Sequence, residues 1–132
     1  APRCLHFFRE LWGTQMRHRL VSELIRNVRL LIQANVLERV ESRGASRDVI
    51  AMKYLPDEKK LNFYQQAPFV QRKVRGAASR FKLRELMIAM DRLLDINCAL
   101  YPRPGVSYVP DAQLMIESFI IELCEGALTA RA

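Results

Sequence analysis

Apolar residues recur every three or four positions along most of this chain, and this spacing limits what the chain can fold into. Between residues 20 and 36 the apolar side chains share one helix face: Val21, Leu24, Ile25, Val28, Leu31, Ile32 and Val36. No stretch alternates apolar and polar residues between turn residues, as a half-buried strand would. The sequence therefore predicts an all-α fold, a bundle of about five helices.

Proline, glycine and helix-capping residues divide this pattern into separate helices. The predicted helices span residues 20–44, 47–54, 68–81, 83–101 and 110–126. Residues 57–66 are polar with a few apolar residues embedded, and they are predicted to form a loop or a weak short helix. Residues 1–19 are expected to form a leading helix or a linker, which Gly13 would interrupt.

Two of the predicted helices have a well-defined apolar face. The helix from Pro68 is predicted to turn inward Val70, Val74, Ala77, Ala78 and Phe81, opposite Arg72, Arg75, Ser79 and Lys82. The helix from Leu83 is predicted to turn inward Leu86, Met87, Met90, Leu93, Leu94 and Tyr101. Asn97 lies within the second face. It could confer specificity at a contact between helices, or it could be a core or partly exposed amide whose hydrogen bonds are satisfied.

The length and the cysteines indicate the organisation and the compartment. A chain of 132 residues is about the size of one domain, so we expect a single helical domain over residues 1–132. Cys4, Cys98 and Cys124 are odd in number and widely spaced, which favours neither disulfides nor zinc, and points to a reducing cytoplasm. No apolar run approaches the length of a membrane span, so no membrane partner is expected. The chain begins Ala-Pro and not Met, and we expect a fragment of a longer protein.

The sequence holds none of the common catalytic motifs. There is no glycine-rich phosphate loop, no Gly-x-Ser-x-Gly elbow and no His-Glu-x-x-His cluster. Cys4 and His6 could supply two metal ligands, but no second pair accompanies them. We therefore expect no enzymatic activity, no metal or other cofactor and no small-molecule substrate.

Charge is distributed unevenly along the chain, whose net charge is +7. Residues 68–84 carry six cations and no acid, whereas residues 111–125 carry acids and no cation. The six are candidate contacts for phosphates or for a partner: Arg72, Lys73, Arg75, Arg80, Lys82 and Arg84. A helix-turn-helix would join residues 47–54 to 68–80, but the segment between is longer than the turn of about 3–4 residues that the motif requires. Nonspecific phosphate contact and a basic face that only meets solvent both stay open.

The last predicted helix has apolar residues on more than one side. Its main face holds Ile116, Phe119, Ile120, Leu123 and Cys124. Leu114, Met115 and Ile121 lie off that face, so we predict that this helix is covered by its own domain and by a partner, with these three residues at a helix interface.

Three segments resemble, in the same order, the carboxyl-terminal region of the bacterial DNA polymerase III delta subunit. Arg26–Ala34 is similar to its Arg-x-x-Arg-Leu-Leu-x-Gln helix, Ala67–Leu86 to its Pro-Phe … Lys … Ala-Arg-Arg-Phe-Ser … Leu run, and Leu93–Leu100 to its Leu-Leu … Asp-x-Ala-Leu-Lys helix. The resemblance covers about residues 20–125. Asn97 and Tyr101 stand where the family tends to have Asp and Lys, and residues 52–66 are longer than the family's turn into the Pro-Phe helix.

The resemblance implies a role in DNA replication. The delta subunit belongs to the clamp loader, an ATP-driven pentamer of the DNA polymerase III holoenzyme that places the sliding clamp on primed DNA, and its carboxyl-terminal helical domain joins the other subunits in a collar. On this basis the chain is a collar domain in the bacterial cytoplasm, its partners are the collar domains of other clamp-loader subunits, and Pro68 and Phe69 start and anchor a collar helix. DNA phosphates are a further candidate partner. Such a domain would neither hydrolyse ATP nor open the clamp.

Two other functions are compatible with the residues. A free-standing basic helical bundle would bind nucleic acid nonspecifically through its phosphates. A helical adaptor unrelated to replication would use the same apolar faces for another partner.

Overall fold

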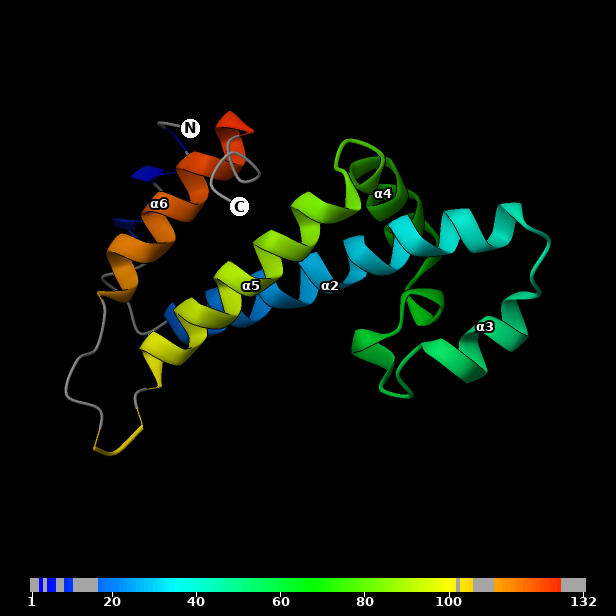
Figure 1. Ribbon diagram of the computed structural model, residues 1–132, viewed down its shortest axis with the longest axis horizontal. Coiled ribbons are helices and arrows are strands. Elements are labelled where there is room, and N and C mark those ends of the chain that lie inside the picture. The colour runs from blue at the N-terminus through cyan, green and yellow to red at the C-terminus, as the bar shows by residue number, and fades with distance from the viewer. Residues whose placement is uncertain are drawn as a thin grey trace. The chain divides into compact units, whose positions relative to one another are not determined.

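The computed structural model describes residues 3, 5, 6, 9, 10, 17–101, 103–105 and 111–126. From Arg17 onward the described backbone forms five α-helices and two short 3-10 turns, and no strand. The helices are α2 (Arg17–Ser42), α3 (Arg47–Tyr54), α4 (Pro68–Ala78), α5 (Leu83–Leu100) and α6 (Ala112–Glu125), and the turns are η1 (Lys59–Leu61) and η2 (Phe63–Gln65) (Figure 1). The predicted all-α class with about five helices is confirmed.

Several helix ends lie at the proline, glycine and capping residues that the sequence indicated. Pro68 stands in the first turn of α4, where a missing N–H leaves no hydrogen bond unmade. The Asp111 carboxylate accepts hydrogen bonds from two backbone N–H groups of the first turn of α6, at 2.9 and 3.3 Å. Gly44 after α2 and Gly126 after α6 have φ of +82° and +67°, a left-handed conformation that glycine adopts without a steric penalty.

The chain divides into two compact units. The central unit is Arg26–Met87, and the terminal unit is Ala1–Ile25 together with Ile88–Ala132. Helices α2 and α5 each contribute residues to both units. The organisation of residues 1–132 as one domain stays a prediction.

The predicted leading helix over residues 1–19 falls only partly on described residues. Among these, Arg3, Leu5, His6, Arg9 and Glu10 have helical backbone, and residues 17–19 begin α2. Gly13, the expected interruption, lies outside the described residues.

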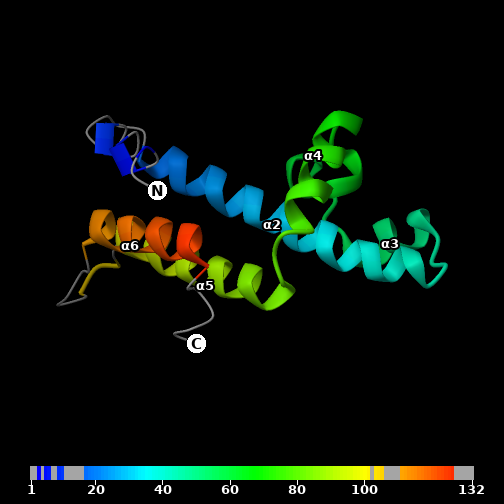
Figure 2. The ribbon, with the colours of Figure 1, turned by 90° about the horizontal axis from the view of Figure 1, so that it is seen from above.

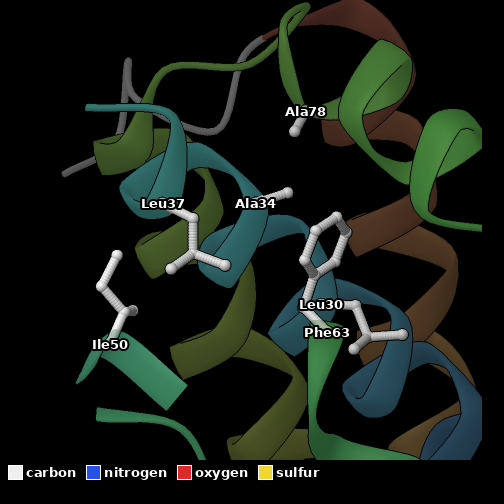
Figure 3. Close-up of a cluster of buried hydrophobic side chains, with 6 residues drawn as sticks. All are labelled: Leu30, Ala34, Leu37, Ile50, Phe63 and Ala78. Carbon is white, nitrogen blue, oxygen red and sulfur yellow. The ribbon is translucent and has the colours of Figure 1, made fainter. Parts of the chain in front are cut away.

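The core of the central unit gathers around α2. Its buried side chains come from α2, α3, η2 and α4: Leu30, Ala34, Leu37, Ile50, Phe63 and Ala78. Figure 3 shows the Phe63 ring beside Leu30, and Ile50 beside Leu37. Phe63 is fully buried, and removing such a side chain from water stabilises the fold by about 1.5–3 kcal/mol.

Hydrogen bonds to side chains hold the segment of the 3-10 turns on α2. The amide of Gln33 donates to the carbonyl of Leu61 (2.7 Å) and accepts from the N–H of Phe63 (2.8 Å). Asn62 is buried and accepts from the N–H of Tyr64 (2.9 Å). These bonds satisfy backbone groups that short turns leave unpaired. Residues 57–66 are therefore irregular, as predicted, but they supply the largest aromatic side chain of this core.

The predicted role of Phe69 as the anchor of α4 is wrong. Its side chain is 65% exposed, while Ala78 of the same helix is buried. Nine positions separate the two, which is about two and a half turns, so they lie on opposite sides of the helix. Because the core contacts the Ala78 side, Phe69 points outward, and Phe63 is the aromatic anchor.

Parts of the predicted apolar faces of α2 and α5 are also wrong. The residues predicted to be buried but found exposed are Val36, Met87, Leu94 and Tyr101. Those buried without having been predicted are Leu30, Ala34, Leu37, Ala89 and Ile96. In α5 the buried positions are 86, 89, 93 and 96, a regular helical stripe one residue away from the large side chains at 87 and 94.

Helix α4 is shorter than predicted. It ends at Ala78, and the N–H groups of Arg80 and Phe81 donate to the carbonyls of Ala77 and Ala78 in a turn (both 3.1 Å). Phe81 is half-buried and lies in the connection to α5, not on an α4 face. The basic segment 68–84 is therefore a helix, a turn and the start of a second helix.

In the terminal unit, α6 runs alongside the part of α5 that belongs to this unit (Figure 2). Its buried apolar residues include Ala89, Leu93 and Ile96 of α5, and Ile116 and Phe119 of α6. Arg92 of α5 donates a hydrogen bond to the carboxylate of Glu122 on α6, and Glu122 is only 6% exposed. This ion pair joins the two helices.

Candidate functional site

All of the net positive charge of the chain lies in the central unit. This unit holds 14 of the 21 Lys and Arg residues and 6 of the 14 Asp and Glu residues, which gives it a formal charge of +8 and leaves −1 for the terminal unit. A polyanion would therefore be attracted to residues 26–87, and the terminal unit offers it no net attraction.

Five of the six predicted cations form what we call the basic surface: Arg72, Lys73, Arg80, Lys82 and Arg84. All five are exposed, on α4, on the turn after it and on the first turn of α5. Their side chains form no ion pair within the part of the chain that the structure describes. Cations without local partners are available to phosphates.

Arg75 is placed differently. Its guanidinium pairs with the Glu41 carboxylate at 2.9 Å and lies over the Phe63 ring, 5.1 Å from the ring centre. The prediction that Arg75 lies on the outer face of α4 with Arg72 is wrong, because the acid at the end of α2 draws it toward the core. Its contribution is to hold α4 against α2.

Glu41 accepts two hydrogen bonds in the central unit, from Arg75 and from the phenol of Tyr64 (2.6 Å). Partial burial would raise the pKa of Glu41, but the hydrogen bonds and the nearby charges of Arg75 and Arg47 outweigh burial, and the pKa is lowered. Burial, together with the hydrogen bond to Glu41, raises the pKa of Tyr64 to about 12. Arg47 stacks on the Tyr64 ring at 4.5 Å, so this cluster joins α2, α3, η2 and α4.

The raised pKa of Tyr64 leads us to expect that the fold loses stability at alkaline pH. The pKa of Tyr64 is raised from 10.0, so the folded state keeps the phenol proton longer than the unfolded chain does. The contribution of the protonated Tyr64 phenol to folding stability is fully present below pH 10, and it is lost as the pH rises to about 12. We expect the Tyr64→Phe variant to lose less stability across this window than the unchanged chain, as measured by urea unfolding. Tyr54→Phe, at an exposed tyrosine, is the matched control; if it and Tyr64→Phe respond alike, the assignment is wrong.

The terminal unit presents apolar side chains on α6. Leu114 and Ile121, which we call the α6 strip, are 62% and 37% exposed. They lie seven residues apart, about two turns, and so share one side of the helix. Met115 is only half-buried, and the opposite side of α6 buries Ile116 and Phe119. That a partner covers this side of α6, with Leu114, Met115 and Ile121 at the interface, stays a prediction.

The structure also contains a surface hollow that sequence reasoning missed. Its volume is about 490 Å³, and its lining comes from α2 and from the turn after α4: Asn35, Glu38, Arg39, Ser42, Ser79 and Phe81. The four α2 residues follow helical spacing on one side, which a search for polar stripes could have found. Their proximity to Ser79 and Phe81 depends on tertiary packing and has no sequence signal.

No described helix has both the length and the apolar character needed to cross a membrane. Comparisons with protein-family models, with curated proteins and with solved structures find no match to this chain.

Proposed function

We propose that this chain is the collar domain of a bacterial clamp-loader delta subunit, which assembles with the collar domains of other subunits. The observation that carries this proposal is the ordered resemblance of three segments to that family. Arg26–Ala34 lies within α2, and Leu93–Leu100 is the second half of α5. Ala67–Leu86 spans α4, the turn after it and the first turn of α5. Helices at all three positions are what a collar domain requires.

Exposed apolar side chains support an assembly role. The α6 strip, with Leu114 and Ile121, lies opposite the buried side of its helix. The phenylalanine of the Pro-Phe motif, Phe69, is exposed and so is not needed by this chain's own core. Large apolar groups at such positions are typical of helix interfaces between subunits.

The test is co-elution of the chain with purified clamp-loader subunits in size-exclusion chromatography. We expect a complex, and we expect Leu114→Asp with Ile121→Asp to weaken it by at least about tenfold, because charge would be buried at the contact. Val49→Asp is the matched control, since Val49 is an exposed apolar residue of the central unit. Failure of the unchanged chain to co-elute would contradict the proposal.

A second candidate function, nonspecific contact with nucleic-acid phosphates, is favoured by the formal charge of +8 on the central unit and by the five unpaired cations of the basic surface. Fluorescence anisotropy with a labelled duplex should show affinity that falls steeply with salt. The slope of log affinity against log salt should become shallower by about 0.9 for each phosphate contact removed, so Arg80→Gln with Lys82→Gln should reduce it by about 2. Affinity that does not change with salt would exclude this function.

A further inference from the structure

The exposed side of α4 combines an aromatic ring with cations. Phe69 is 65% exposed, and the exposed Arg72 and Lys73 follow it by three and four residues, so all three share one side of the helix. Helix α4 contains no acid, and neither cation forms an ion pair within the described part of the chain. A partner that covers this side of α4 therefore needs apolar and acidic groups together.

Gly76 continues this side of α4 as bare backbone. It is exposed and lies seven residues after Phe69, which is about two turns. Its φ is not positive, and a Cβ added to it would meet no atom within 4 Å. Nothing in this chain's own backbone or packing requires glycine here, although glycine destabilises a helix relative to alanine. A helix of another molecule can approach closely at this position. We call Phe69, Arg72, Lys73 and Gly76 the α4 face.

The α6 strip has the chemistry that the α4 face needs. Leu114 and Ile121 are both exposed, and their spacing of seven residues equals that between the two ends of the α4 face. One turn beyond each end of the strip stands an exposed acid, Asp111 before Leu114 and Glu125 after Ile121. Helix α6 contains no cation. The two surfaces therefore match in spacing and are opposite in charge.

The charges around the two surfaces favour the same pairing. Residues 88–126, which include α6, carry six acids and two cations, a formal charge of −4, and one of these cations, Arg92, already pairs with Glu122. The central unit, which includes α4, has a formal charge of +8. Opposite charges steer two molecules together and fix the register of their contact. Two copies of this chain supply both surfaces.

We propose that the α6 strip of one copy docks on the α4 face of a second copy. The apolar side chains of the strip pack against Phe69 and against the bare backbone at Gly76, and the acids at the ends of the strip lie near the cations of the α4 face. Such a contact is heterologous, because it joins two different surfaces, so it can extend into a ring or an open chain of copies. The inference goes beyond the collar role, since it concerns the pure chain.

The test is sedimentation velocity of the purified chain over a series of concentrations. We expect self-association with a dissociation constant of about 10–100 μM, weaker than an interface of standard size, and we expect added salt to weaken it further. Leu114→Asp with Ile121→Asp, and separately Arg72→Glu with Lys73→Glu, should each weaken it by at least about tenfold, because each pair of changes removes one of the two surfaces.

Lys59→Glu with Lys60→Glu is the matched control for charge. It makes the same change of charge at exposed residues of the central unit that lie outside the α4 face, so association should weaken by less than about twofold. If the control weakens association as much as Arg72→Glu with Lys73→Glu does, overall charge and not the α4 face is responsible, and the proposal is wrong.

A mixture of the two surface variants distinguishes a heterologous contact from a symmetric one. Each variant alone should be monomeric, but the equimolar mixture holds one intact α6 strip and one intact α4 face, so it should form a dimer that grows no further. A symmetric contact between two α6 strips would instead leave the Arg72→Glu with Lys73→Glu variant associated by itself, which overturns the proposal.

The unchanged chain decides the matter even if a variant does not fold. A chain that stays monomeric throughout the series, or an association that salt does not weaken, overturns the proposal. Failure here also differs from failure of the collar role. Co-elution with clamp-loader subunits by a chain that does not self-associate overturns only this inference, and self-association without co-elution overturns only the collar role.

Discussion

Replacing Phe63 by alanine is expected to lower the free energy of unfolding of the central unit by about 3–5 kcal/mol, the usual cost of deleting a large buried side chain. The ring is 0% exposed and packs in one cluster with residues of α2, α3 and α4. The cluster cannot close fully around alanine, and Arg75 loses the ring beneath its guanidinium. Since domains are stable by only about 5–15 kcal/mol, this change alone should bring the unit close to unfolding.

Phe69→Ala is the matched control, at the phenylalanine that the sequence indicated as an anchor. Its side chain is 65% exposed, so we expect a change within about 0.5 kcal/mol. Urea unfolding followed by circular dichroism measures both variants. If Phe69→Ala proved as costly as Phe63→Ala, the packing of the central unit described above would be wrong.

Arg92→Ala is expected to destabilise the terminal unit by about 1.5–3 kcal/mol, because it leaves the Glu122 carboxylate with less compensation in a buried position. The side chain of Glu122 is 8% exposed and that of Arg92 is 31% exposed, so Arg92 meets solvent while its partner does not. Thermal or urea unfolding of the full chain measures the effect.

A second variant identifies the cause. Adding Glu122→Gln to Arg92→Ala removes the buried charge while nearly keeping the shape of the side chain, so the double variant should be more stable than Arg92→Ala alone. If the double variant is no more stable, lost packing of the arginine stem and not the buried charge explains the first result.

Local signals were enough to predict where the helices lie. Proline and glycine act on the backbone at their own position, which is why Pro68, Gly44 and Gly126 marked ends that the structure confirms. The Asp111 cap is equally local, since its partners are in the next turn. Such features require no knowledge of the rest of the fold.

Which residues are buried depends on partners far away in the chain, and there the predictions failed in part. Phe63 and Phe69 look alike in sequence, but of the two Phe63 packs into the cluster around α2, where Gln33 also accepts a hydrogen bond from its N–H at 2.8 Å. In the sequence Glu122 is one of several acids in the last helix, and its ion pair with Arg92 of α5 is seen only in the structure. In α5, Ala89 is buried while Met87 is 55% exposed, because Ala89 lies on the buried stripe of positions 86, 89, 93 and 96 and Met87 does not.

In the candidate site, too, local features were predicted and contacts between distant residues were not. Five of the six predicted cations are exposed, as is usual for charged side chains. Arg75 differs because Glu41, 34 positions away, reaches it. The hollow was not predicted, since it needs residues of α2 and of the turn after α4 together.

We propose that subunit assembly depends on the α6 strip and that nucleic-acid contact depends on the basic surface. The most direct measurement puts two variants through both assays: Leu114→Asp with Ile121→Asp, and Arg80→Gln with Lys82→Gln. We predict that the first loses co-elution with clamp-loader subunits but keeps its affinity for nucleic acid, and that the second does the reverse. Absence of any complex with the unchanged chain, or loss of both activities in both variants, would contradict the claim.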